Sequence, residues 1–431
     1  MLNNEQNELL CRVEGAAPMG QLMRRHWLPL CLSEEVAQAD GAPVRARLLG
    51  EDLVAFKDTN GKIGVLDERC PHRGASLVYG RNEDCGLRCL YHGWKFDIEG
   101  KCVDMPSEPG GGGSARRVMR TKSYPAHEAG GFVWIWMGAP EAMRPFEPPA
   151  WAPPANCRTA VVKMHAECNW AQVLEGSIDS AHSSSLHSTE MPAAQVDSAK
   201  ATGKVWPRPS NDKAPKLQFE PTSYGFRYAA LRKPILNPDT HQYVRTTLFI
   251  APFTVLIPPN DQYNLAQMLV PIDDVNTMFY WVAWHPDASK GISQEEWRSF
   301  CAATVGVDLD LNFRKIRNLS NRYLQDRAAM KQGDFTGIKG IPTQDMAMWE
   351  SMGPIADRSR DHPGSSDVAV VQFRRMMVAA VKKFQDGAPA IGTAEPHIPH
   401  VQLASFEGIV PKSADWRAAG PATRESAIPQ S

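Results

Sequence analysis

The chain has 431 residues, of which 43% are hydrophobic, so it can bury a large core and form two domains or more. Lys and Arg number 47 against 48 Asp and Glu, and this near balance excludes a large basic surface for nucleic acid or an anionic membrane. The nine cysteines follow no repeating spacing, which argues against a secreted disulfide scaffold. The N-terminus is polar and acidic and no apolar run could span a bilayer, so we expect a cytoplasmic protein.

The first third of the chain predicts a small antiparallel β domain. Short apolar segments are separated by turn signals, among them Asn60-Gly61. The prolines between Pro145 and Pro154 cannot continue a strand ladder and indicate a linker. We expect this domain over residues 40–150, preceded by a helical segment, 1–39, that packs with the C-terminal domain. The expected strands are residues 43–56, 62–67, 94–98 and 131–137.

Residues 151–431 predict a second domain, of the α+β class, because long strands are mixed with helical stretches. No internal repeat divides it. The expected strands are residues 224–232, 243–251, 262–270 and 277–284, and the expected helices are residues 168–182, 294–303, 310–330 and 343–352.

Two Cys–His pairs lie in the β domain. Cys70-Pro-His72 is followed, after sixteen residues, by Cys89-Leu-Tyr-His92. Zinc would accept two thiolates and two imidazoles, but this spacing resembles the Rieske [2Fe-2S] signature, in which two histidines replace thiolates on one iron. The flanking glycines also fit that family. The resemblance implies a Rieske cluster held by Cys70, His72, Cys89 and His92.

A polar stripe opens the second domain. Its members recur at helical spacing and include the neighbouring Asp179 and His182. His187 breaks the pattern, so both histidines can reach one metal only if the helix ends near Ser183-Ser184-Ser185. Two histidines and a carboxylate on one face of iron(II) leave three positions open for dioxygen and water, although zinc hydrolase sites can look similar.

The order Glu175, Asp179, His182, His187, about ninety residues after the Cys–His pairs, resembles the catalytic domain of Rieske ring-hydroxylating oxygenases. That family places its third iron ligand, an Asp, in a late helix shortly after a Gln or Glu, and Gln344-Asp345 fits. Thr343 is expected to cap this helix and put Asp345 in its first turn, whereas Glu350 is expected to be solvated. The resemblance therefore implies His182, His187 and Asp345 as ligands of a mononuclear iron(II).

The resemblance covers essentially the whole chain and is greatest to the phthalate-type members of the family. It implies a Rieske domain of antiparallel β structure followed by a helix-grip catalytic domain, an antiparallel sheet with helices. It also implies an NADH-dependent flavin and iron-sulfur reductase as electron donor, dioxygen as co-substrate, and phthalate or a related aromatic carboxylate as substrate, converted to a cis-4,5-dihydrodiol. Asp179 would hydrogen-bond a cluster histidine of a neighbouring subunit in a homo-oligomer, a trimer or two stacked trimers.

A dianion in an apolar pocket calls for arginine, whose planar fork pairs with carboxylates. Arg245 lies in the apolar segment 243–251, where an unpaired charge is costly, and Arg208 lies in a loop after Trp206. Both are candidates for substrate binding, although arginines are mostly exposed, and Arg227 or Arg232 could take their place.

Two other functions fit parts of this pattern. A Rieske monooxygenase or O-demethylase acting on another aromatic acid, such as vanillate or a phenoxybenzoate, would have the same two metal sites, because pocket shape decides the product. A plain Rieske electron carrier is disfavoured by the second set of metal ligands.

Overall fold

The computed structural model describes residues 2–419, which form two compact units. The smaller unit is Val13–Glu147, and the larger one combines residues 2–12 with residues 148–419. The smaller unit consists of antiparallel sheets and the larger one of an antiparallel sheet with helices, which confirms the expected fold class. The domain limits 1–39, 40–150 and 151–431 stay predictions.

The smaller unit contains three sheets, all antiparallel. Their strands, in spatial order, are β1 (Trp27–Leu32), β10 (Phe132–Trp136) and β9 (Ala126–Ala129); β2 (Val44–Leu48), β3 (Glu51–Lys57) and β4 (Ile63–Asp67); and β5 (Arg81–Glu83), β6 (Gly86–Arg88), β7 (Lys95–Phe96) and β8 (Cys102–Asp104). Helices α2 (Pro18–Met23) and α3 (Gly113–Val118) are short.

The expected strand over residues 43–56 is two strands, β2 and β3. They are joined by a two-residue turn at Leu49 and Gly50, which have φ of 49° and 82°. Positive φ at both central residues is the geometry of the hairpin turns that match the twist of antiparallel strands, and Gly50 adopts it without strain. Leu49 stands before Gly50 where Asn or Asp usually marks such a turn, so the sequence pattern did not indicate it.

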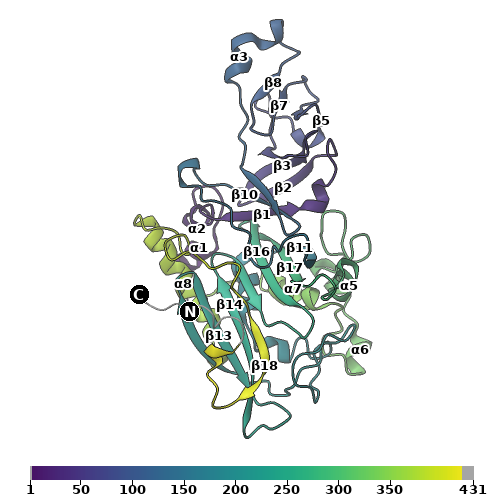
Figure 1. Ribbon diagram of the computed structural model, residues 1–431, viewed down its shortest axis with the longest axis vertical. Coiled ribbons are helices and arrows are strands. Elements are labelled where there is room, and N and C mark those ends of the chain that lie inside the picture. Colours follow the sequence, from purple (N-terminus) through teal and green to yellow (C-terminus); the bar gives the residue numbers. More distant parts are fainter. Residues whose placement is uncertain (1, 420–431) are drawn as a thin grey trace. The chain divides into compact units, whose positions relative to one another are not determined.

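An eight-stranded antiparallel sheet forms the centre of the larger unit (Figure 1). Its order is β11 (Arg158–Ala166), β17 (Asn276–His285), β16 (Asn264–Asp273), β15 (Thr254–Ile257), β14 (His241–Ile250), β13 (Gly225–Arg232) and β12 (Lys216–Thr222), with β18 (Phe406–Pro411), drawn in yellow, paired to β14. The helices are α1 (Asn4–Cys11), α4 (Trp170–Ile178), α5 (Gln294–Phe300), α6 (Arg327–Lys331), α7 (Ile341–Ser351) and α8 (Val368–Gln385), and 3₁₀ turns include η5 (His182–Ser184) and η6 (Leu319–Leu324).

Helix α4 is the element that positions the site. It packs against β15, β16 and α7, and nearly all its side chains are buried. A Cβ at Gly176 would lie 2.0 Å from the indole nitrogen of Trp349 on α7. The two helices therefore approach more closely than any larger residue at position 176 would allow.

The prediction of a helix over residues 310–330 is wrong for the first half of that range. The carboxylate of Asp310 accepts hydrogen bonds from the backbone N–H groups of Asn312 (2.8 Å) and Arg314 (2.9 Å), a local turn that competes with helix formation. Only η6 and the short α6 form in this region.

Glu350 is buried, contrary to the expectation that it is solvated. Lys315 Nζ donates to its carboxylate at 2.6 Å, and the hydroxyl of Tyr323 donates to its other oxygen. Both partners come from the segment that was expected to be helical, so these contacts could not be predicted.

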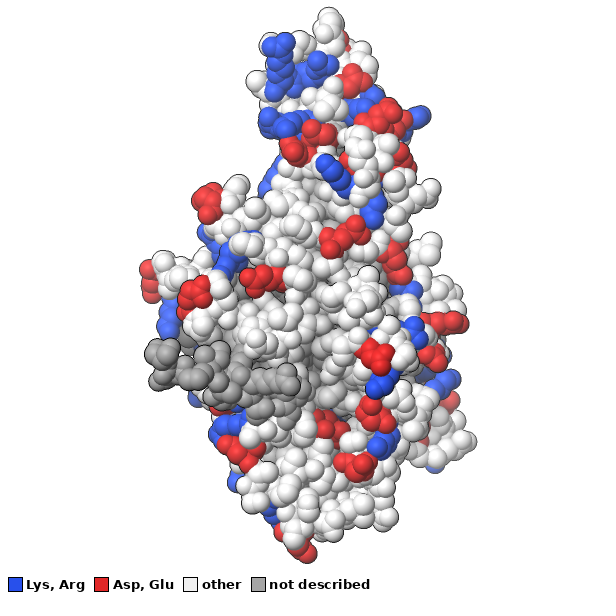
Figure 2. Space-filling model, viewed as in Figure 1, with Lys and Arg blue, Asp and Glu red and all other residues white. Residues whose placement is uncertain are grey.

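No helix within residues 2–419 combines the length and apolarity that a bilayer crossing requires. Acidic and basic side chains are interspersed over most of the face shown in Figure 2. An anionic ligand must therefore be recognised by a local group of cations rather than by the overall field.

Candidate metal centres and substrate pocket

Two loops of the smaller unit hold their cysteines in matching backbone turns. In the first, Cys70 N–H donates to Ala75 O (2.9 Å) and Gly74 N–H donates to Cys70 O (2.8 Å). In the second, Cys89 N–H donates to the carbonyl five residues on (2.8 Å) and Gly93 N–H donates to Cys89 O (3.0 Å). Both glycines have positive φ, 74° and 76°, which explains why each loop needs one.

The four candidate cluster ligands lie together, as a Rieske cluster requires. Cys70 and Cys89 belong to the buried core of the unit, and the rings of His72 and His92 lie 4.4 Å apart between centroids. His72 Nδ1 is buried without a hydrogen-bond partner among residues 2–419, a cost that coordination to a metal would remove. Burial raises the pKa of the Cys70 thiol to about 11, so a metal is needed to hold it as thiolate at neutral pH.

Helix α4 runs from Trp170 to Ile178, so the helix expected over residues 168–182 starts two residues too early and ends four residues too late. The carboxylate of Asp179 accepts from Ala181 N–H at 2.7 Å and turns the chain out of the helix. His182 then lies in a separate 3₁₀ turn. The requirement that the helix end before His187 is met, but by Asp179 rather than by the three serines.

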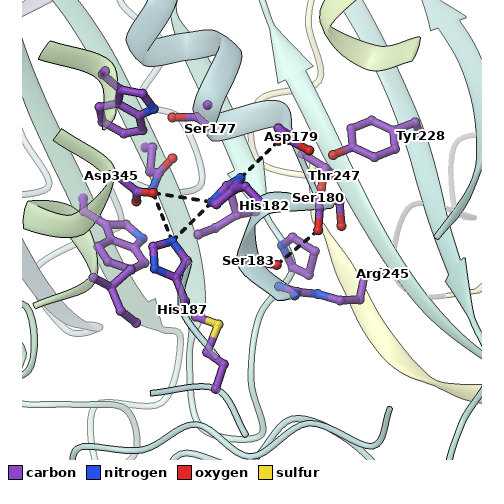
Figure 3. A pocket seen from close by; sticks show the side chains of 18 residues that line it. Ser177, Asp179, Ser180, His182, Ser183, His187, Tyr228, Arg245, Thr247 and Asp345 are labelled. Carbon is purple, nitrogen blue, oxygen red and sulfur yellow. Dashed lines mark hydrogen bonds and ion pairs between the residues drawn. The ribbon is translucent and has the colours of Figure 1, made fainter. Parts of the chain in front are cut away.

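Three side chains converge at one point in Figure 3. The Nε2 atoms of His182 and His187 lie 3.2 Å apart. Asp345 Oδ1 lies 3.0 Å from His187 Nε2 and 3.4 Å from His182 Nε2. One ligand atom from each of the three residues falls within 4.8 Å of the others, so a single cation can contact all of them.

Asp345 reaches this point from α7, although the cap of that helix differs from the expectation. The helix begins at Ile341, after Gly340 with φ 87°, and no side chain caps it. Thr343 therefore lies inside the helix, and Asp345 lies in its second turn rather than its first. Buried Asp345 still points to the histidines, because Gly176 lets α4 and α7 pack closely.

The site is rich in negative charge. Burial lowers the pKa of His182, but the carboxylates of Asp179 and Asp345 outweigh it and leave the pKa raised. Burial raises the pKa of Asp179, but His182 and backbone N–H groups outweigh it and leave the pKa lowered. His182 Nδ1 lies 3.5 Å from Asp179 Oδ2. Two imidazoles and one carboxylate, with a second carboxylate behind, suit a divalent iron with open positions.

A pocket opens beside these three residues. Its floor comes from the sheet, through Tyr228, Arg245 and Thr247, and from the loop after α4 through Ser180 and Ser183 (Figure 3). Apolar groups complete it, namely Met191, Ile257, Pro258, Trp281, Ile341 and Trp349. A flat apolar molecule with an anionic edge matches this lining.

Three buried arginines gather around the loop that carries His182. Arg208, Arg232 and Arg245 are 6%, 4% and 8% exposed, and within residues 2–419 none forms an ion pair with a carboxylate. Arg208 donates to Ser183 O (2.9 Å) and Arg232 donates to Ser180 O (2.6 Å), while Arg245 lines the pocket.

Burial and, after it, the charge of Arg245 lower the pKa of Arg208 to about 9 and that of Arg232 to about 10. A carboxyl close to them, that of Glu407, lies opposite Arg245 in the β14–β18 register, and burial raises its pKa. The cluster therefore has a surplus of positive charge that an anion would neutralise.

The fourth arginine, Arg227, is elsewhere: it pairs with Glu220 and lies over the ring of Trp416. Arg232 was expected only as a substitute for Arg208 or Arg245, and Ser180 was not expected at the pocket. The position of Ser180 between Asp179 and His182 could have indicated its place, whereas a single Arg at the end of a strand carries no such signal.

Comparison with known proteins decides the family. A model of the Rieske [2Fe-2S] domain matches residues 26–125, and a model described as LigXa C-terminal domain like matches residues 135–431. The chain belongs to the Rieske oxygenases. This Rieske oxygenase is 59% identical to the phthalate 4,5-dioxygenase oxygenase subunit of Pseudomonas putida, over 97% of its own length and 94% of that protein. It is 36% identical to the 3-chlorobenzoate-3,4-dioxygenase oxygenase subunit of Comamonas testosteroni, with 97% and 98% covered.

Solved structures agree in fold. NdmA of Pseudomonas putida CBB5, solved with caffeine, matches with a TM-score of 0.61 at 17% identity, over 87% of this chain and 95% of that one. The matched Rieske [2Fe-2S] domain and the group formed by His182, His187 and Asp345 confirm the expected cofactors of this Rieske oxygenase, a [2Fe-2S] cluster and a mononuclear iron.

Proposed function

We propose that this chain is the terminal oxygenase of a phthalate 4,5-dioxygenase system. Phthalate, dioxygen, two electrons and two protons would give the cis-4,5-dihydrodiol. The observation that supports the substrate class is a group of three buried arginines without a carboxylate ion-pair partner within residues 2–419: Arg245 lines the pocket, and Arg208 and Arg232 bind the loop beside it. The 59% identical relative named for this activity supports the same substrate.

We assign the cluster to Cys70, His72, Cys89 and His92, and the iron to His182, His187 and Asp345. When bound, the iron supplies dioxygen activation, and the cluster supplies an electron. The protein's own contribution is positioning. Arg245 would hold the carboxylates at one end of the pocket, so that the far edge of the ring, carbons 4 and 5, faces the iron ligands.

Arg208 and Arg232 would act partly by holding the loop that carries His182 in place. Both bind backbone carbonyls on either side of His182, so they fix the loop that carries this ligand while adding positive charge next to the pocket. Arg208 can turn from Ser183 to a carboxylate of the substrate, since the hydroxyl and carbonyl of Ser183 lie at the pocket wall.

Asp179 would link the two metal centres. It lies beside the ring of His182, and we propose that it also hydrogen-bonds a cluster histidine of a neighbouring subunit. This role requires a homo-oligomer, a trimer or two stacked trimers. The electron donor would be an NADH-dependent flavin and iron-sulfur reductase, and the cytoplasm the expected compartment.

The test is NADH-coupled dioxygen consumption with phthalate, benzoate and vanillate offered separately. We expect dioxygen, NADH and phthalate to be consumed one to one to one, with benzoate poorly used because it lacks the second carboxylate. Formaldehyde release from vanillate at a higher rate than phthalate turnover would instead make this chain an O-demethylase.

A further inference from the structure

Gln344 precedes Asp345 in α7 and is fully buried, at 0% exposure. Its side-chain amide uses its whole donor capacity. Oε1 lies 2.8 Å from His187 Nδ1, and Nε2 donates to Glu190 Oε1 (2.8 Å) and to Ile338 O (2.8 Å). A fully buried amide with three such bonds is held in one orientation.

The partners decide which end of the amide faces His187. A carboxylate oxygen and a carbonyl oxygen both need donors, so the NH₂ group must face Glu190 and Ile338. The amide oxygen then faces His187 Nδ1, which has to carry a proton to form this hydrogen bond. The lone pair of His187 is consequently on Nε2, the atom that lies 3.0 Å from Asp345 Oδ1.

We propose that Gln344 is the positioning residue of the iron site: it locks the ring and the Nδ1–H tautomer of His187, and Glu190 in turn anchors Gln344. This inference rests on the proposed assignment of His187 as an iron ligand. One helix, α7, then supplies one ligand and orients a second, through two adjacent residues.

The amide also separates the Glu190 carboxylate from the metal ligands. Metal-bound histidines commonly donate their second N–H to a carboxylate or a carbonyl oxygen. Here Gln344 supplies a neutral oxygen and leaves the negative charge of Glu190 one side chain farther away. The imidazole of His187 is thus oriented without adding a third carboxylate to Asp179 and Asp345.

The chain offers a matched control in Gln172. This residue is also 0% exposed, and its amide makes three hydrogen bonds, to Trp349 O (2.9 Å), Gly353 O (2.8 Å) and Ala356 N–H (2.8 Å). It thus braces the other end of α7 but touches no iron ligand. Gln344→Met, on α7, and Gln172→Met, on α4, each remove three buried hydrogen bonds at nearly constant side-chain volume.

The experiment measures Co(II) affinity by equilibrium dialysis of protein stripped of mononuclear iron with its cluster intact, together with Co(II) EPR and the melting temperature. We expect Gln344→Met to weaken Co(II) binding about 10- to 100-fold and to alter the EPR signal. Gln172→Met should lower the melting temperature at least as much yet keep the wild-type affinity and signal. Gln344→Glu, which keeps an acceptor for His187 but loses the donor to Glu190 and Ile338, should recover only part of the affinity.

Wild-type affinity and EPR in Gln344→Met, or an equal loss in Gln172→Met, would overturn the role of Gln344. His187→Ala separates this outcome from a failure of the assignment beneath it. If His187→Ala loses Co(II) while Gln344→Met keeps it, only the positioning role is wrong. If His187→Ala keeps Co(II), the proposed iron site itself is wrong.

Discussion

The Nε2 atoms of His182 and His187 lie 3.2 Å apart, although five residues separate them. On a regular helix, residues five apart lie on different faces. The pair forms here because α4 ends at Ile178 and the chain continues in a 3₁₀ turn. Two unprotonated ring nitrogens facing each other would repel, and a cation between them turns that repulsion into coordination.

Replacing Asp179 tests the link between the two metal centres. Asp179→Asn should keep the iron content and the cluster spectrum, because Asp179 holds neither metal in our assignment. NADH-coupled turnover should fall by more than about tenfold, since the neutral amide removes the negative charge that strengthens the proposed hydrogen bond to a cluster histidine of the neighbouring subunit. Exposed Asp357→Asn is the control, and a fully active Asp179→Asn enzyme would exclude the bridging role.

Gly176 is expected to be essential for the spacing of α4 and α7. In Gly176→Ala the new Cβ would lie 2.0 Å from the Trp349 indole nitrogen, so α7 must move and carry Asp345 with it. Overpacking of this kind costs about 1–3 kcal/mol, and we expect reduced iron content as well as a lower melting temperature.

A second substitution tests whether the clash with Trp349 is the cause of the lost iron. Trp349→Leu removes the clashing ring, so the double variant should regain iron relative to Gly176→Ala alone. Gly364→Ala, where the nearest atom to an added Cβ is 3.7 Å away, should change neither quantity. Unchanged iron content in Gly176→Ala would contradict the packing argument.

The metal ligands were predictable from the sequence to different degrees. The cluster ligands lie in two short motifs, each folding as one turn around a glycine, so their spacing alone identifies them. Asp345 is 158 residues beyond His187 and was found only through the family's Gln-Asp pattern. Its helix start and the burial of Glu350 depend on contacts between distant segments, which local patterns do not encode.

The arginines near the pocket were also only partly predictable from the sequence. Arg245 could be selected because it interrupts an apolar strand, and the structure places it in the pocket lining. Arg232, at the end of the neighbouring strand β13, looked no different from Arg227, which the structure pairs with Glu220. Strand register decides which of two such residues lies near Arg245, and one chain's sequence does not specify it.

Replacing Arg245 should weaken the binding of a dianionic substrate more than it slows the reaction of the bound substrate. We expect Arg245→Gln to raise the KM for phthalate at least about 30-fold, since truncating one partner of a buried charge pair costs about 2–5 kcal/mol. Both metal centres should stay intact by EPR and metal analysis. Arg227→Gln, on the adjacent strand, should leave the KM unchanged, and equal effects of the two substitutions would argue against the assignment.

Substrate binding should weaken at high pH. Burial lowers the pKa of Arg208 to about 9, and the charge of Arg245 contributes, so the unliganded protein begins to lose this proton above pH 9. A bound carboxylate would raise that pKa again, so binding takes up a proton in this range and affinity falls as pH rises from 8 to 10. Calorimetric titration in buffers of different ionisation enthalpy measures the uptake. Constant affinity to pH 10 without proton uptake would refute it.

A single turnover tests directly whether this chain dihydroxylates phthalate. The purified protein is reduced and then mixed with phthalate and ¹⁸O₂ in the absence of any reductase. The mass of the product is measured by mass spectrometry. We expect a product that is heavier than phthalate by two hydrogens and two oxygens, with both oxygens labelled. A product with one labelled oxygen, or unchanged phthalate from protein with both metal centres loaded, would contradict it.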